Sequence, residues 1–227
     1  MLVLALDTAT PAITAGIVAL ADSGPRLLAE RVTLDPRAAG ELLTPQVHQV
    51  AEAAGIALAE LAAIVTGAGP GPFTSLRAGM VTAAAFGHAL DKPVHPVSTL
   101  DAIAAGTSHD AGLLVVTDAR RREVYWSAYD AAGRNVTGPR VDRPDAVAEL
   151  LTGELAGLGI TQVAGHVAAQ HAELFGLAVL DAAYPTPVGL VRAAESALGG
   201  EPAPLTPLYL RRPDAVEPAG RKRVSPA

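Results

Sequence analysis

The chain has 227 residues, of which 50% are hydrophobic and 18% charged, so it is long enough for one large or two small globular domains and too apolar for a disordered protein. Its longest apolar stretches fall far short of the ~20 residues that span a bilayer, and no basic segment precedes the first, so we expect no membrane association and no export. The absence of cysteine excludes disulfides, thiolate nucleophiles and cysteine-ligated zinc, and favours the cytoplasm as compartment. The net charge is -6, and five basic residues lie from Arg211 onward, so the body of the chain is acidic and should repel nucleic acid.

The first 107 residues combine strand-like and helical patterns. The predicted strands are short apolar runs, and they cover residues 1–7, 13–20, 26–32, 62–66 and 92–97. Apolar residues at helical spacing predict a helix over 40–54, although Pro45 interrupts the pattern, and a long helix over 75–90. Another helix should begin at Ser98, because a hydroxyl residue is followed by an acid in the first turn.

A polar, turn-rich stretch at 107–112 marks the expected boundary between two domains. Beyond it, the sequence predicts a hairpin over 113–130, helices over 145–151 and 188–198, and short strands over 162–164 and 177–180. A final extended segment is predicted over 207–211. We therefore predict a first domain over 1–107, a smaller second domain over 108–211 and a disordered basic tail over 212–227.

Asp7 ends the first predicted strand and is followed by Thr8 and Thr10. A carboxylate with neighbouring hydroxyls at a strand end can hold a metal-bound phosphate. The same residues also favour an ordinary turn, because Asp and Thr side chains hydrogen-bond to their own backbone. Both interpretations are open at this point.

Gly69, Gly71 and Thr74 lie in a glycine-rich loop between a strand and a helix, where backbone N–H groups and the helix dipole attract anions. The loop is not a Walker motif, since no Lys-Ser or Lys-Thr follows the glycines, and its two prolines remove N–H donors. A rigid loop that presents Phe73 to a partner is the alternative. Arg77 is either an anion ligand or a solvated, ion-paired side chain.

Small residues recur every four positions on the helix after this loop, which leaves a smooth stripe. Such a stripe lets another helix approach closely, within the fold or across a subunit interface. The predicted partner interface consists of the small and apolar residues of this helix: Phe73, Leu76, Gly79, Met80, Ala83 and Gly87.

No motif for hydrolysis or metal binding stands out. The six histidines contain no His-x-x-x-His pair and no Gly-x-Ser-x-Gly elbow is present, so we expect no catalytic residues and no metal site. The densest basic cluster is Arg120-Arg121-Arg122 in the hairpin turn, which either clamps phosphate or is a solvated tip. In the next strand, alternation places Trp126 on one face and Tyr125 and Tyr129 on the other.

Five motifs, in order, make the chain resemble the TsaB (YeaZ) family of tRNA-modification proteins. They are LALDTAT at 4–10, GPGPFTSLRAG at 69–79, PVSTL at 96–100, DARRREVYW at 118–126 and PLYLR at 207–211. The resemblance implies an α/β protein with the actin, sugar-kinase and Hsp70-like (ASKHA) fold, in which two related domains each surround a mixed sheet. It also implies a non-catalytic scaffold subunit that dimerises with the catalytic subunit TsaD and supports threonylcarbamoyl transfer to adenosine 37 of tRNA, the synthesis of t6A.

The resemblance implies further partners: the ATPase TsaE through the TsaB–TsaD complex, a second copy when the chain is alone, and tRNA through the complex. It implies no cofactor in the isolated chain, with a nucleotide at a complex interface as an open question. On this interpretation the phosphate-site residues are vestigial, namely Asp7, Thr8, Thr10, Gly69, Gly71, Thr74 and Arg77.

The sequence departs from its relatives at several positions. TsaD holds a metal through two histidines where this chain has Thr99 and Ile103, neither of which can replace an imidazole. Many relatives carry His-Ser at Ala39-Gly40, so a role for that pair does not transfer. Superfamily nucleotide sites use glycines where this chain has Arg120–Arg122. The alternative function is an independent ATP-dependent phosphotransferase of the same superfamily, or a glycoprotease-like peptidase.

Overall fold

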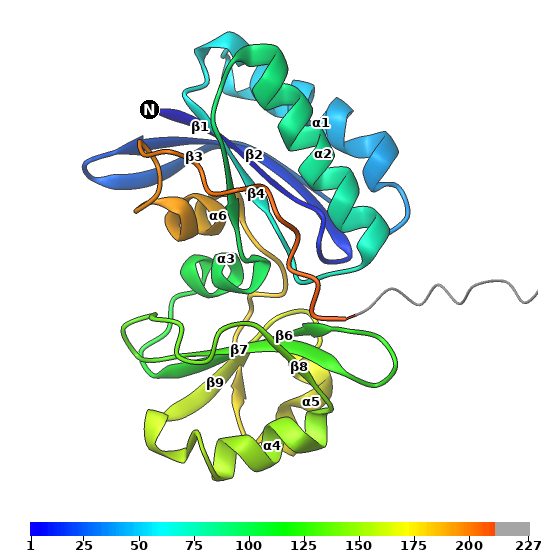
Figure 1. The fold of residues 1–227 in the computed structure, drawn as a ribbon. Coiled ribbons are helices and arrows are strands. Elements are labelled where there is room, and N and C mark those ends of the chain that lie inside the picture. The colour runs from blue at the N-terminus through cyan, green and yellow to red at the C-terminus, as the bar shows by residue number, and fades with distance from the viewer. Residues whose placement is uncertain (212–227) are drawn as a thin grey trace, which may run out of the picture.

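The computed structural model describes residues 1–211 and contains two five-stranded mixed sheets with helices between and outside them (Figure 1). The first sheet has the order β3-β2-β1-β4-β5. Its strands are β1 (Leu2–Asp7), β2 (Ala12–Ala21), β3 (Gly24–Leu34), β4 (Ala63–Gly67) and β5 (Val94–Val97). The β1, β2 and β3 strands form an antiparallel meander, whereas β4 runs parallel to β1 and β5 parallel to β4. The meander and both later strands were predicted from the sequence.

Two helices lie side by side on the outer face of the first sheet, α1 (Ala39–Ala54) and α2 (Phe73–Leu90), with the 3-10 turn η1 (Leu58–Glu60) after α1 (Figure 1). Leu43, Val47 and Val50 recur at helical spacing along α1, and all three are buried in the core that it forms with the sheet. The α1 helix ends at Gly55, whose φ of 68° suits glycine because no Cβ opposes the left-handed conformation.

The inner face of the first sheet carries α6 (Pro187–Ala194), and α3 (Thr99–Gly106) packs between α6 and the second sheet. Side chains cap both helices: Ser98 accepts a hydrogen bond from the Asp101 N–H, and Thr186 accepts one from the Gly189 N–H. Apolar residues of α6 are buried against β1 and β4 in a second core.

The second sheet repeats the topology of the first, with the order β10-β9-β6-β7-β8. Its strands are β6 (Gly112–Asp118), β7 (Val124–Tyr129), β8 (Arg140–Asp142), β9 (Ile160–Ala164) and β10 (Ala178–Val179). Its outer face carries α4 (Pro144–Thr152), the 3-10 turn η2 (Ala156–Leu158) and α5 (Ala168–Phe175). As predicted, Trp126 is buried on this outer side, while Tyr125 and Tyr129 are buried on the other.

The helices between the sheets do not follow the predicted domain ranges. The α3 helix, from the predicted first domain, buries Leu100 and Ile103 against Leu113 and Val115 of the second sheet. Conversely, α6 comes from the predicted second domain and packs on the first sheet. The α3 helix is apolar on two sides: Ala102 is buried in the core that α6 forms with the first sheet, and Leu100 and Ile103 are buried against the second sheet. The division at residue 107 therefore remains a prediction for the sheets and fails for α6, and the predicted tail, 212–227, lies outside the described residues.

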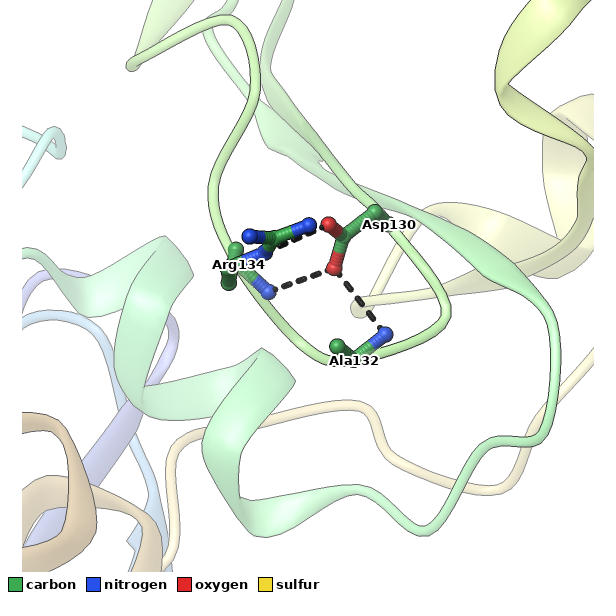
Figure 2. A network of polar contacts seen from close by, with 3 residues as sticks. All are labelled: Asp130, Ala132 and Arg134. Carbon is green, nitrogen blue, oxygen red and sulfur yellow. Dashed lines mark hydrogen bonds and ion pairs between the residues drawn. The ribbon is translucent and has the colours of Figure 1, made fainter.

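Hydrogen bonds to the Asp130 side chain hold the loop that follows β7 (Figure 2). The Asp130 carboxylate accepts hydrogen bonds from the backbone N–H groups of Ala132 and Arg134, at 2.9 Å each, and from Arg134 Nε at 2.8 Å. These bonds, led by that from the Arg134 backbone, lower the pKa of Asp130. All the donors belong to one loop, so the network is structural.

No helix formed by residues 1–211 is long and apolar enough to cross a bilayer.

Candidate functional site

Asp7 lies at the carboxyl end of β1, where sequence analysis placed a phosphate or metal ligand. Its side chain is fully buried, with Oδ2 accepting a hydrogen bond from Thr99 Oγ1 at 2.6 Å and Oδ1 accepting one from the Ala9 N–H at 2.8 Å. The second carboxylate oxygen also fills the space over Gly67, where any Cβ would overlap it. Burial raises the pKa of Asp7 from 3.8 to about 6, although the two hydrogen bonds oppose the rise.

Thr99 explains why this acid is closed off. The resemblance to TsaD implies a metal-binding histidine at this position, whereas here the Thr99 hydroxyl donates a hydrogen bond to the carboxylate. Within residues 1–211, no three His, Asp or Glu side chains come close enough to hold a metal ion. The Asp7 carboxylate is therefore buried and hydrogen-bonded within the fold rather than presented to a ligand.

Most of the other residues predicted to bind phosphate pack the loop after β1 against the glycine-rich loop before α2. Thr8 and Thr10 are buried; Thr8 Oγ1 donates to the Ser75 carbonyl at 2.6 Å, and Thr10 Oγ1 accepts from the Ala12 N–H. Gly71 lies against the Ala9 backbone so closely that a Cβ would overlap it. Gly69 has a φ of 92°, and Thr74 is exposed. The structure thus packs Thr8, Thr10 and the glycines into a seam between two loops rather than an open anion site, whereas Thr74, together with Gly71, lines a cavity at the N-terminal end of α2.

The predicted partner interface on α2 is wrong for most of its residues. Leu76, Met80 and Ala83 are buried in the chain's own core. Two of the glycines are buried as well, because Gly79 packs on Thr8 and Gly87 on Val94 with no space for a Cβ. The small-residue stripe therefore serves close packing within the fold. Of the six predicted residues, Phe73 is the one that remains substantially exposed, at 38%.

The exposed face of α2 differs from the predicted one and, beyond Arg77, carries no carboxylate, lysine or arginine. From Ala78 to Leu90 the helix contains no acidic or basic residue other than His88, and its exposed side includes Val81, at 66%, with Ala84 and Ala85. The neighbouring α1 contributes exposed His48, whose ring contacts Phe86 edge-on at 6.1 Å between centroids. We call this surface the α1–α2 face. Sequence periodicity identifies its residues as one side of a helix but does not say which side faces solvent.

The final extended segment connects the two halves, although its residues were not predicted as site residues. The Leu208 N–H donates to the Ala68 carbonyl at 2.8 Å, and Arg77 Nε donates to the Tyr209 hydroxyl at 2.6 Å. Tyr209 also stacks on Phe73, with ring centroids 5.2 Å apart. Arg211 donates to the Ala119 carbonyl and forms an ion pair with Glu123, both in the β6–β7 hairpin. Arg77 therefore belongs to a surface stack and not to the Asp7 region.

The β6–β7 hairpin divides two cavities. One, of about 760 Å³, lies between the N-terminal ends of α1 and α2, the hairpin and the final segment. The other, of about 670 Å³, is lined by the far side of the hairpin and by α4 and α5, including His166 and His171. Burial lowers the pKa of both histidines, and His166 Nε2 lies 3.3 Å from the Asp118 backbone nitrogen. Arg120, Arg121 and Arg122 all adopt positive φ, of 60°, 53° and 62°, where a glycine would cost less.

Comparison with known proteins gives a consistent family. Residues 34–180 match the family model described as TsaD, tRNA N6-adenosine threonylcarbamoyltransferase. An uncharacterized protein of Mycobacterium tuberculosis is 52% identical over 94% of this chain and 93% of its own length. An uncharacterized protein of Mycobacterium leprae is equally similar, but the match spans 56% of its length. The Bacillus subtilis tRNA threonylcarbamoyladenosine biosynthesis protein TsaB is 34% identical over 57% of this chain and 55% of its own.

Similar solved structures agree with the predicted fold. A Pseudomonas aeruginosa protein described as similar to the peptidase YeaZ superposes with a TM-score of 0.76 at 30% identity, covering 92% of this chain and 99% of that one. YeaZ from Pseudomonas aeruginosa gives 0.73 at 26% identity, with the same coverage. An activator of 2-hydroxyisocaproyl-CoA dehydratase from Clostridium difficile gives 0.53 at 12% identity, covering 87% and 94%, and supports the ASKHA-like fold alone. The chain therefore belongs to the family that the TsaD model describes and, within it, to the TsaB (YeaZ) proteins.

Proposed function

We propose that this chain is a non-catalytic subunit in the synthesis of t6A at position 37 of tRNA, and that it acts in the cytoplasm by pairing with a TsaD-type catalytic subunit. The relatives named for this pathway support the role in t6A synthesis. The ATPase TsaE would join through the pair, and tRNA would be held mainly by the catalytic partner. Without that partner, the chain would form a homodimer through the same surface.

The observation that carries the proposal is the sealed Asp7. A catalytic carboxylate has to reach a substrate or a metal, yet Asp7 is buried and its two oxygens are engaged by Thr99 and Ala9. A phosphotransferase of this fold would need that acid open. The accessory role needs only a surface that a partner can cover.

The α1–α2 face supplies that surface. Between Ala78 and Leu90 its α2 side carries no carboxylate, lysine or arginine, which limits the desolvation cost of covering it, and its alanines allow a partner helix to approach closely. Val81, at 66% exposure, would be its main buried apolar side chain in the complex. This surface replaces the interior stripe as the proposed interface.

The test is threonylcarbamoyl transfer to unmodified tRNA by purified TsaD, TsaE and the threonylcarbamoyl-AMP synthase TsaC, with and without this chain. We expect transfer only when the chain is added and no turnover by the chain alone. Transfer that proceeds equally without it would overturn the accessory role. ATP turnover by the isolated chain that is lost in Asp7→Ala would instead favour the phosphotransferase alternative.

The interface is tested by Ala85→Glu, with Ala169→Glu on α5 as its matched control. Both positions are exposed on helices, so each change adds one surface charge, but Ala85 lies on the α1–α2 face and Ala169 does not. We expect Ala85→Glu to abolish co-elution with TsaD and the added transfer activity, while Ala169→Glu keeps both. Equal behaviour of the two variants would place the interface elsewhere.

A further inference from the structure

The 760 Å³ cavity gathers arginines in an otherwise acidic chain. Arg37 comes from the loop before α1, Arg120 from the β6–β7 hairpin and Arg211 from the final segment, and all three line it. Glu41 is the one acidic residue in its lining. Three separate parts of the chain thus contribute positive charge to one place, against a net charge of -6 for the whole protein.

Two of these guanidinium groups are available for a ligand. Arg211 is already engaged by Glu123 and by the Ala119 carbonyl, and so holds the hairpin beside the cavity. Arg37 and Arg120 are exposed, and neither forms an ion pair with residues 1–211. Arg120 is also kept at a φ of 60°, a conformation that glycine or asparagine would tolerate better.

Exposed aromatic rings line the same cavity. Phe73 is 38% and Tyr209 41% exposed; the two rings stack on each other, and the Arg77 guanidinium carbon lies 3.6 Å from the Phe73 ring centroid. The cavity also receives the N-terminal ends of α1 and α2, neither of which has a side-chain cap, so backbone N–H groups of their first turns add to the positive potential. Its volume exceeds what a single phosphate ion needs and matches pockets for larger ligands.

Free arginines beside exposed aromatic rings form the combination that recognises single-stranded nucleic acid, because the arginines neutralise phosphates while the rings stack on bases. We propose that this cavity binds single-stranded RNA, with Arg37 and Arg120 on the phosphates and Phe73 and Tyr209 beside the bases. The proposed function leaves tRNA to the catalytic partner, so this is a second, direct contact. It is measured on the isolated chain, and its failure would leave the partner-dependent transfer assay unaffected.

The test measures fluorescence anisotropy of a fluorescein-labelled, 12-nucleotide single-stranded RNA with the full chain. The binding variant is Arg37→Gln/Arg120→Asn, since asparagine keeps the positive φ of the hairpin. The matched control is Arg26→Gln/Arg31→Gln, which removes two exposed charges from β3, outside the cavity lining. We expect the binding variant to weaken RNA binding roughly tenfold and to lower the slope of log affinity against log salt by about 1.4, whereas the control stays close to wild type.

A second pair of variants tests whether the Tyr209 ring stacks on RNA bases. Tyr209→Leu should weaken binding roughly fivefold or more by removing a stacking ring, while Tyr209→Phe, which loses only the hydroxyl bonded to Arg77, should not. The proposal is overturned if the wild type shows no RNA binding at micromolar concentrations, or if the control variant loses as much affinity as the binding variant. ADP that binds alone and displaces the RNA would overturn the RNA assignment in favour of a free nucleotide.

Discussion

Replacing Asp7 by asparagine should stabilise the fold at neutral pH, because the buried carboxylate is costly when charged. Asparagine has nearly the same shape, its carbonyl can accept from the Ala9 N–H, and its amide can donate to Thr99 Oγ1 once that hydroxyl turns. The variant thus keeps both hydrogen bonds and removes the charge. The exposed Asp22→Asn change provides a control for the loss of one negative charge.

The magnitude follows from the pKa. Burial raises the pKa of Asp7 from 3.8 to about 6, so between these values the folded state holds a proton that the unfolded state has released. The free energy of unfolding therefore falls as pH rises through this window, by about 3 kcal/mol in total, and stays at its lower level above pH 6. The Asp7→Asn variant lacks this loss. Its gain over wild type should be near zero at pH 4 and approach about 3 kcal/mol at pH 7.5.

Urea denaturation at pH 4, 5, 6 and 7.5 measures this difference directly. The informative quantity is the gain of Asp7→Asn relative to wild type, since other titrating groups cancel. A gain that does not change with pH, or a variant less stable than wild type at pH 7.5, would refute the conclusion that burial destabilises the charged form of Asp7. Under the accessory-subunit proposal, the same variant should still support threonylcarbamoyl transfer.

Three further changes test other parts of the structure by chemical denaturation. Gly71→Ala should destabilise the fold by roughly 1–3 kcal/mol, because its Cβ would overlap the Ala9 backbone; an unchanged midpoint would show that the loop can move away. Arg122→Asn should stabilise by about 1 kcal/mol, since its φ of 62° suits asparagine better, and a loss would reveal an interaction that outweighs the strain. His95, buried and without a hydrogen-bond partner among residues 1–211, has a lowered pKa because of burial. The contribution of His95 should therefore lower the stability of wild type relative to His95→Leu as pH falls below about 6.5. A difference between the two proteins that does not change with pH would contradict this expectation.

Sequence patterns alone determined the family and most of the secondary structure, although they did not predict β8 or α5. The alternation of short apolar runs with helical spacing located both sheets, and strand alternation placed Trp126 opposite Tyr125 and Tyr129, because successive strand residues face opposite sides. Five ordered motifs identified the family because their order and spacing are jointly more specific than any one of them. These features are local or depend on chain order, so no packing information is needed to read them.

Only the tertiary structure decided which surfaces are open. The period of a helix shows that Gly79, Ala83 and Gly87 share a face, yet alanine and valine also occupy the opposite side of α2, so the sequence could not tell which of the two packs inside. Asp7 and Thr99 are 92 positions apart, and Arg77 and Tyr209 are 132 apart. Long-range contacts of this kind decide whether a carboxylate is buried and which arginines line a cavity. The reason is that burial and local charge depend on neighbours in space rather than along the chain.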